Sequence, residues 1–349
     1  MGKFKIGLTR DFLNPDGELN ADIGLELLDG HPNIEYEFMD EFKTVITPDQ
    51  IKDYDAVISL YPAYTKDSFK GVERLTAIAR AGVGFDGVDL DACTEADIIC
   101  FTAPKAVRRP MAVSILTFML ALGSKVFAKD KIVREGRWED TTNHMGVGLK
   151  NKVVGSVGLG GIAQEFFQIS KPLEYIGLAY DPFVSEEEAN KLGVKLVDLE
   201  TLLKESDFLS ISVPSMDSTY HLIGERELSL MKPTAFLINT ARGPIVDQQA
   251  LTKCLQEKRI QGAALDVFET EPLDPKDPIT TLDNVILAPH AIGFTDELFR
   301  GLGEEDINGI LRIAQGLIPD SVVNKEVLHK DGLKSKLAHH RESNVVINN

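Results

Sequence analysis

The sequence predicts an α/β protein made of two doubly wound parallel-sheet domains. Short apolar strands alternate with helices over the first hundred residues, and the alternation restarts near residue 150. Such alternation is typical of a parallel sheet covered by helices. A glycine motif in a strand–turn–helix context lies about halfway along the 349 residues, a length typical of two domains. We therefore expect one domain to precede the motif and a second domain to begin near it.

Strands are expected where short apolar runs end at turn residues. The runs are 4–8, 34–38, 55–60, 75–81, 153–157, 175–180, 207–213, 235–239, 263–266 and 285–287. Helices are expected over 21–28, from Asp247, and over 295–315. One long helix is expected to start after Pro110 and to continue from an apolar stretch into a polar one that ends at Gly136. The polar residues 331–349 are expected to form a mobile tail.

Composition excludes several classes of function. The net charge of −17 argues against a surface for nucleic acid or an anionic membrane. Cys93, Cys100 and Cys254 are widely spaced and odd in number, which indicates a reducing compartment. The N-terminus is typical of a strand rather than a signal peptide, and we expect no apolar run long enough to span a membrane. The prediction is a cytoplasmic protein that acts on a small molecule.

The glycine motif is typical of a dinucleotide site. Gly158 permits a tight turn, Gly160 lets the backbone approach a pyrophosphate, and Ala163 allows close packing of helix against strand. The backbone N–H groups of Gly161 and Ile162 would face the phosphates at the positive end of the helix dipole. The alternative is an ordinary glycine turn between a strand and a helix.

Asp181 supports the dinucleotide interpretation. It ends the next strand, 23 residues after Gly158, close to the spacing of the acid that binds the adenosine ribose. A carboxylate there would repel a 2′-phosphate, so the expected cofactor is NAD rather than NADP. The alternative is a turn residue before Pro182.

Three later strands end in polar groups. Arg242 follows residues 235–239, Glu271 follows 263–266, and His290 follows 285–287. Because ligands of parallel sheets bind at the carboxyl ends of the strands, these side chains could converge on one cleft.

These segments, the glycine motif and the turn RAGVGFD at residues 80–86 together resemble the D-isomer-specific 2-hydroxyacid dehydrogenases, over roughly residues 4–325. The resemblance implies a Rossmann NAD-binding domain, residues 104–294, inserted into a flavodoxin-like substrate domain, residues 1–103 and 295–330. It also implies NAD(H)-dependent reversible reduction of a 2-keto acid to a D-2-hydroxy acid, by a homodimer formed through the NAD domain.

The resemblance implies a role for each polar group. His290 would be the general acid and base, which suits an imidazole near neutral pH. Glu271 would orient its ring, and Arg242 would bind the substrate carboxylate and polarise the carbonyl. The backbone N–H groups of Val83 and Gly84 would hold the carboxylate from the other domain. No metal ion is expected.

Further cofactor contacts are implied at the same edge. Asp266 would contact the nicotinamide carboxamide, with further contacts from Val213, Thr240 and Gly293. Several alternatives stay open: Glu269 could replace Glu271, Asp266 could brace its loop, and Arg242 could form a structural ion pair. His144 and His221 are assigned to structure.

The sequence departs from the family at Arg108 and Arg109, where small and polar residues are usual. They are either solvated residues at a helix start or a pair that recognises an acidic substrate. The loop at 61–66 identifies no substrate. Two alternatives share this fold: an NAD(H)-sensing corepressor and a phosphite-type dehydrogenase.

Overall fold

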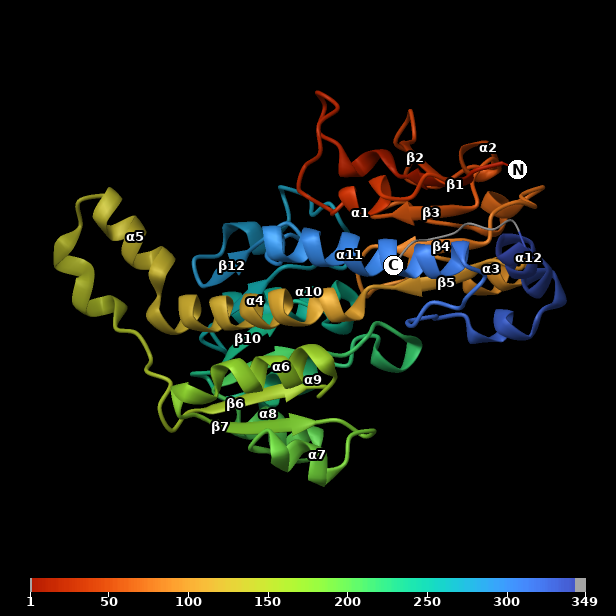
Figure 1. Ribbon diagram of the computed structural model, residues 1–349. Helices are drawn as coiled ribbons and strands as arrows, with labels where there is room; N and C mark the ends of the chain where they lie inside the picture. The colour runs from red at the N-terminus through yellow and green to blue at the C-terminus, as the bar shows by residue number, and fades with distance from the viewer. Residues whose placement is uncertain (1, 343–349) are drawn as a thin grey trace. The chain divides into compact units, whose positions relative to one another are not determined.

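The chain divides into two units, which the computed structural model describes over residues 2–342 (Figure 1). Unit 1 consists of Met1–Val107 and Thr295–Asn349, and unit 2 consists of Arg108–Phe294. The chain therefore completes unit 2 between two passages through unit 1.

Unit 1 contains a parallel sheet of five strands in the order β2-β1-β3-β4-β5. The strands are β1 Phe4–Leu8, β2 Ile34–Phe38, β3 Ala56–Ser59, β4 Ala77–Arg80 and β5 Ile99–Thr102. Ile58 packs into the core on one face with Ile307 of α11 (Asp296–Ala314), while its neighbour Val57 packs into the core on the other face. The strands are therefore buried on both faces, as expected for a parallel sheet, and the order is that of a flavodoxin-like domain.

The remaining helices of unit 1 are short. They are α1 Glu26–Asp29, α2 Pro48–Ile51, α3 Leu90–Glu95 and α12 Asp331–Glu342. The helix predicted over 21–28 is wrong for most of its length. Gly24 adopts a left-handed conformation (φ +73°), and its N–H is bound by the Asp22 carboxylate, so the chain turns there instead.

Unit 2 contains a parallel sheet of seven strands in the order β12-β11-β10-β9-β6-β7-β8. The strands are β6 Val153–Val157, β7 Ile176–Tyr180, β8 Val194–Leu196, β9 Phe208–Ile211, β10 Phe236–Asn239, β11 Gly262–Leu265 and β12 Val285–Leu287. The chain order reverses between β6 and β9, which places the expected ligand site at the carboxyl ends of these strands. The predicted pair of doubly wound domains is confirmed.

Helices of unit 2 pack on both faces of this sheet. They are α6 Gly161–Ser170, α7 Glu186–Lys191, α8 Leu199–Glu205, α9 Glu225–Leu230 and α10 Gln248–Gln256. Helix α5, Val126–Arg134, contacts the segment Trp138–His144 instead. Figure 1 shows α6 beside β6, and its Phe166 and Phe167 are buried in the core with Val154. One face of the sheet thus carries the helix that follows the glycine turn.

The long helix α4, Pro104–Ser124, starts earlier than predicted. Pro110 therefore lies inside the helix rather than before it. The earlier start is stabilised by Glu305, whose carboxylate accepts hydrogen bonds of 3.0 Å from the N–H groups of Lys105 and Ala106. The helix ends at Ser124, because the next residue, Lys125, adopts a left-handed conformation (φ +54°). The predicted continuation beyond that residue is a separate helix, α5.

Helix α4 is also long and apolar enough to cross a membrane by length and composition alone, contrary to prediction. Half of its most apolar 18-residue stretch is buried, and Ile115, Phe118 and Met119 belong to the core of unit 2. These contacts identify α4 as a core helix.

The prediction of a mobile tail from residue 331 is wrong for α12. Leu333 and Leu337 are buried in the core of unit 1, and His340 Nε2 lies 2.9 Å from Thr76 Oγ1. Leu333 and Leu337 are four residues apart and therefore lie on one face of the helix, although the segment as a whole is polar. The last part of the predicted tail, 343–349, lies outside the described residues.

Candidate active site

The turn between β6 and α6 requires glycine at its first position. Gly158 adopts φ +93°, and a Cβ added there would lie 2.5 Å from the Ser212 carbonyl oxygen. It would also lie 2.7 Å from the Val213 side chain, so Val213 borders the turn. The turn is thus packed against the end of β9, the strand across the reversal in chain order.

The next positions leave space above the helix start. A Cβ on Gly160 would meet no protein atom within 4 Å, so no protein contact requires glycine there. Ala163 is buried against the sheet and brings α6 close to it. An open glycine before the first N–H groups of α6, including that of Ile162, fits a pyrophosphate placed against the helix start.

Asp181 joins this turn to the end of β7. Its Oδ2 accepts a 2.8 Å hydrogen bond from Leu159 N–H, and its Oδ1 accepts one of 2.8 Å from Phe183 N–H. Each oxygen can accept a further hydrogen bond, since a carboxylate offers about four lone-pair sites. The Asp181 carboxylate is therefore hydrogen-bonded to the glycine turn, which is where an acid that binds the adenosine ribose is expected.

The loops after β11 and β12 bring Glu271 and His290 together. Glu271 Oε2 lies 2.7 Å from His290 Nδ1, and Glu271 Oε1 accepts a 2.9 Å hydrogen bond from Phe268 N–H. His290 adopts a left-handed conformation (φ +55°), and its side chain is 43% exposed. The imidazole is held through one nitrogen while its ring stays accessible.

The electrostatics of this pair favour an ionised Glu271. Burial alone would raise the pKa of Glu271. The hydrogen bonds from His290 and Phe268, and the nearby charges of His290 and Arg242, outweigh burial and lower this pKa below its ordinary value. A carboxylate at this position stabilises a positively charged imidazole.

Arg242 lies directly after β10. Its backbone carbonyl accepts a 3.0 Å hydrogen bond from the buried Asn239 amide, and its Nη1 donates to the Ala241 carbonyl at 2.7 Å. A Cβ on Gly243 would overlap the Phe268 carbonyl. The loops after β10 and β11 are therefore in close contact, and Arg242 and Glu271 share one edge of the sheet.

Asp266 braces the loop that carries His290. It is 2% exposed, and its Oδ1 accepts hydrogen bonds from Ala291 N–H (2.9 Å) and Ile292 N–H (3.0 Å). Burial raises its pKa, opposed by these two hydrogen bonds. These hydrogen bonds support the alternative that Asp266 braces its loop, while a contact between Asp266 and the nicotinamide stays a prediction. Thr240, after β10, and Gly293, in the braced loop, also lie at this edge.

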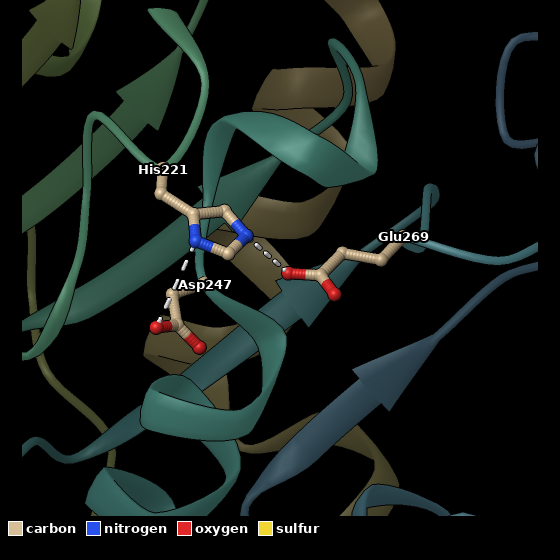
Figure 2. Close-up of side chains that lie close together, drawn as sticks. All are labelled: His221, Asp247 and Glu269. Atoms are coloured by element: carbon tan, nitrogen blue, oxygen red, sulfur yellow. Dashed lines mark hydrogen bonds and ion pairs between the residues drawn. The ribbon is translucent and has the colours of Figure 1, made fainter.

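A second histidine pairs with the neighbouring glutamate. Figure 2 shows His221 between Glu269, 2.8 Å from Nε2, and Asp247, 3.9 Å from Nδ1. The potential ligand atoms of this cluster lie within 4.8 Å of one another. However, the two carboxylates face opposite nitrogens of the ring, so one metal ion could not take both carboxylates and a ring nitrogen without rearrangement. Glu269 is therefore occupied elsewhere, and Glu271 is the glutamate that meets His290.

The remaining predicted residues lie outside this group. Val83 and Gly84 belong to unit 1, in the turn after β4, where Gly82 adopts φ +132°. Arg109 forms an ion pair of 3.3 Å with Glu165 of α6, and Arg108 lies against Gly161. The contact between Arg108 and Gly161 was missed from the sequence, although the extra glycine in the motif was a signal for it.

Comparison with known proteins supports the interpretation of these loops. Residues 116–291 match the model of the D-isomer specific 2-hydroxyacid dehydrogenase NAD-binding domain. A glyoxylate reductase of Korarchaeum cryptofilum is 37% identical over 284 residues, which cover 80% of this chain and 86% of that protein. A D-3-phosphoglycerate dehydrogenase of Archaeoglobus fulgidus is 37% identical over 79% of this chain, but the match spans only 52% of that protein.

The solved structures give the same result. The holo form of Rhodotorula graminis D-mandelate dehydrogenase superposes with a TM-score of 0.80 and 27% identity, covering 93% of this chain and 98% of that one. The expected cofactor, NAD, and the expected class of enzyme, an oxidoreductase, are both supported. With relatives matched over four fifths of its length, the chain belongs to the NAD-dependent D-isomer-specific 2-hydroxyacid dehydrogenase family.

Proposed function

We propose that the protein reversibly reduces a small 2-keto acid to the D-2-hydroxy acid, with His290 as the acid and base. The observation that carries the proposal is the 2.7 Å contact between Glu271 Oε2 and His290 Nδ1. Because Glu271 engages Nδ1, Nε2 is the nitrogen that can face a substrate. In the reductive direction, Nε2–H donates its proton to the carbonyl oxygen, which becomes the hydroxyl.

Arg242 supplies the positive charge that this reaction needs. It binds the substrate carboxylate and polarises the carbonyl, which favours attack at the carbonyl carbon. Bound NADH supplies the hydride that this carbon receives. The N–H groups of Val83 and Gly84 hold the carboxylate from unit 1, which fixes the face of the carbonyl that is attacked.

The cofactor contacts follow from the edge of the unit 2 sheet. Gly160, Gly161 and Ile162 receive the pyrophosphate, and Asp181 binds the adenosine ribose. We assign contacts around the nicotinamide end to Val213, Thr240, Asp266 and Gly293. A carboxylate at 181 disfavours a 2′-phosphate, which accounts for a preference for NAD.

The cellular setting is also a proposal. The three cysteines are free and buried, which supports a reducing, cytoplasmic location. A homodimer through unit 2 is supported by exposed apolar side chains after α4, among them Phe127 (60% exposed) and Trp138 (68% exposed). Light scattering at several protein concentrations tests the dimer.

A substrate panel tests the reaction. NADH oxidation is followed with glyoxylate, hydroxypyruvate, pyruvate, larger keto acids and phosphorylated keto acids, and glyoxylate is tried first because several relatives are named glyoxylate reductase. We expect turnover of at least one 2-keto acid and formation of the D-product. Binding of NADH without turnover of any of them would overturn the proposal in favour of the corepressor. Turnover of phosphite alone would favour the phosphite-type alternative.

A further inference from the structure

We propose that Arg108 binds the pyrophosphate of the cofactor from outside the glycine motif. The proposal rests on the cofactor site described under the proposed function, and it adds a residue to that site. It assigns to the cofactor a side chain for which the sequence suggested an acidic substrate or no ligand at all.

Helices α4 and α6 are in contact at Arg108. Arg108 lies near the start of α4, and Gly161 is the first residue of α6. A Cβ added to Gly161 would lie 2.7 Å from Arg108 Nε, 3.1 Å from Cζ and 3.3 Å from Cδ. The guanidinium group therefore covers the residue whose N–H belongs to the first turn of α6.

The positive charge of Arg108 has no partner among the described residues. Within residues 2–342, no hydrogen bond or ion pair is found for the exposed Arg108 guanidinium, whereas its neighbour Arg109 is paired with Glu165. A helix N-terminus carries a partial positive charge, and a cation placed beside it is repelled. An anion bound at the start of α6 would be attracted both by the helix N-terminus and by this guanidinium.

The space at the start of α6 suits a pyrophosphate. Gly160 leaves open space beside the same N–H groups. The Asp181 carboxylate, which accepts a hydrogen bond from Leu159 N–H, lies where the adenosine ribose is expected. A pyrophosphate at the helix start would lie between the N–H groups and the guanidinium. Arginine suits this task because its planar fork can donate two hydrogen bonds to phosphate oxygens.

The same contact explains an unusual feature of the motif. Gly161 is not one of the three fingerprint positions, which are occupied by Gly158, Gly160 and Ala163. Glycine at 161 leaves room for the Arg108 side chain, which a Cβ at this position would displace. The extra glycine and the arginine, 53 residues apart, therefore form one device for binding phosphate.

The test measures binding rather than turnover. Kd values for NADH, ADP-ribose and adenosine are determined by titration calorimetry or NADH fluorescence for wild type, Arg108→Ala, Arg108→Lys and Arg109→Ala. Arg108→Ala should raise the Kd of NADH and of ADP-ribose about tenfold or more, as expected for loss of a charged hydrogen bond. Adenosine has no phosphate, so its Kd should stay unchanged. Arg108→Lys should lie between, and Arg109→Ala should remain within about twofold of wild type.

A double-mutant cycle sharpens the test. Gly161→Ala should weaken NADH binding in the wild-type background, because its Cβ displaces the guanidinium, and should add little to Arg108→Ala. Fully additive effects of the two substitutions on the Kd of NADH would contradict the proposal that Gly161 and Arg108 act together.

The outcomes separate the two proposals. Failure of wild type to bind NADH would overturn the cofactor site itself. Tight binding that Arg108→Ala leaves unchanged, or a change confined to the substrate KM, would overturn only the role of Arg108. Circular dichroism should show an intact fold, since this side chain is exposed and forms no ion pair within the described residues.

Discussion

Unit 2 contains two histidine–glutamate pairs that look alike and differ in one respect. His290 and His221 both adopt left-handed conformations, with φ of +55° and +48°, and each lies within 2.8 Å of a glutamate. Glu271 engages Nδ1 of His290, whereas Glu269 engages Nε2 of His221 and leaves Nδ1 facing Asp247. The pairs therefore differ in the nitrogen that the glutamate occupies: Nε2 of His290 does not face Glu271, whereas both nitrogens of His221 face carboxylates.

The surroundings of the second pair support a structural role for His221. Glu269 Oε1 also accepts a 3.0 Å hydrogen bond from Gln248 N–H, and Asp247 caps α10 through Ala250 N–H. The His221 ring stacks on Tyr220 with centroids 4.0 Å apart. This histidine therefore connects its own loop to the start of α10 and to the loop after β11. His290 has one carboxylate partner and stays more exposed.

The largest expected difference between the pairs is in turnover. His290→Ala should lower kcat by about 10²–10⁴-fold, because it removes the group that exchanges the proton. NADH affinity should change little. His221→Ala should keep kcat within about fivefold, because its nitrogens face carboxylates rather than the proposed substrate site. Steady-state kinetics with the best keto acid, alongside NADH titration, measures both variants. Near-normal turnover by His290→Ala would invalidate the comparison.

A smaller effect is expected from the glutamates. Glu271→Gln keeps an oxygen that can accept from Nδ1 but removes the charge that stabilises an imidazolium, so kcat should fall by about 10²-fold or more. Glu269→Gln is the matched control, since it makes the same change on the other pair. It should leave kcat and its pH profile nearly unchanged. Equal losses in the two variants would show that both glutamates act on one site.

The sequence predicted the strands and the polar groups at their ends because both depend on local pattern. Arg242, Glu271 and His290 each follow a short apolar run, and parallel strands bring such ends to one edge. The resemblance to a family then selected Glu271 over Glu269, two residues away. The structure adds the contact that distinguishes them, since each glutamate faces a different histidine.

Apart from the helix predicted over 21–28, which a local turn at Gly24 replaces, the errors involve contacts between residues far apart in the chain. The start of α4 depends on Glu305, about two hundred residues later. The packing of α12 depends partly on the contact between His340 and Thr76. The role of Gly161 depends on Arg108. A local pattern carries no information on these partners, so helix limits and the phosphate-binding arginine could not be predicted from it.

The second pair should affect stability more than activity. His221→Asn removes the hydrogen bond to Glu269 and leaves two carboxylates without the ring between them. The free energy of unfolding should fall by about 1 kcal/mol, typical of one lost hydrogen bond, with a decrease in Tm of about 2–4 °C. Thermal unfolding followed by circular dichroism measures this. His290→Asn is the matched control. It should shift Tm less, because His290 connects fewer segments of the chain than His221 does. The reverse order would contradict the structural assignment.

The smallest effect concerns the pH dependence of stability at the first pair. Burial opposes ionisation of Glu271, but the hydrogen bonds from His290 and Phe268 outweigh burial and hold the pKa of Glu271 below its ordinary value. A carboxylate with a depressed folded-state pKa contributes stability above its unfolded pKa and loses that contribution as pH falls through the folded value. Wild type should therefore be more stable than Glu271→Gln at neutral pH, and this difference should shrink below about pH 4.5. The side chain is 36% exposed, so the difference should stay under about 1 kcal/mol. Tm values of both proteins from neutral to acidic pH measure it, and a difference that does not vary with pH would show that the Glu271 carboxylate is not stabilised by its partners.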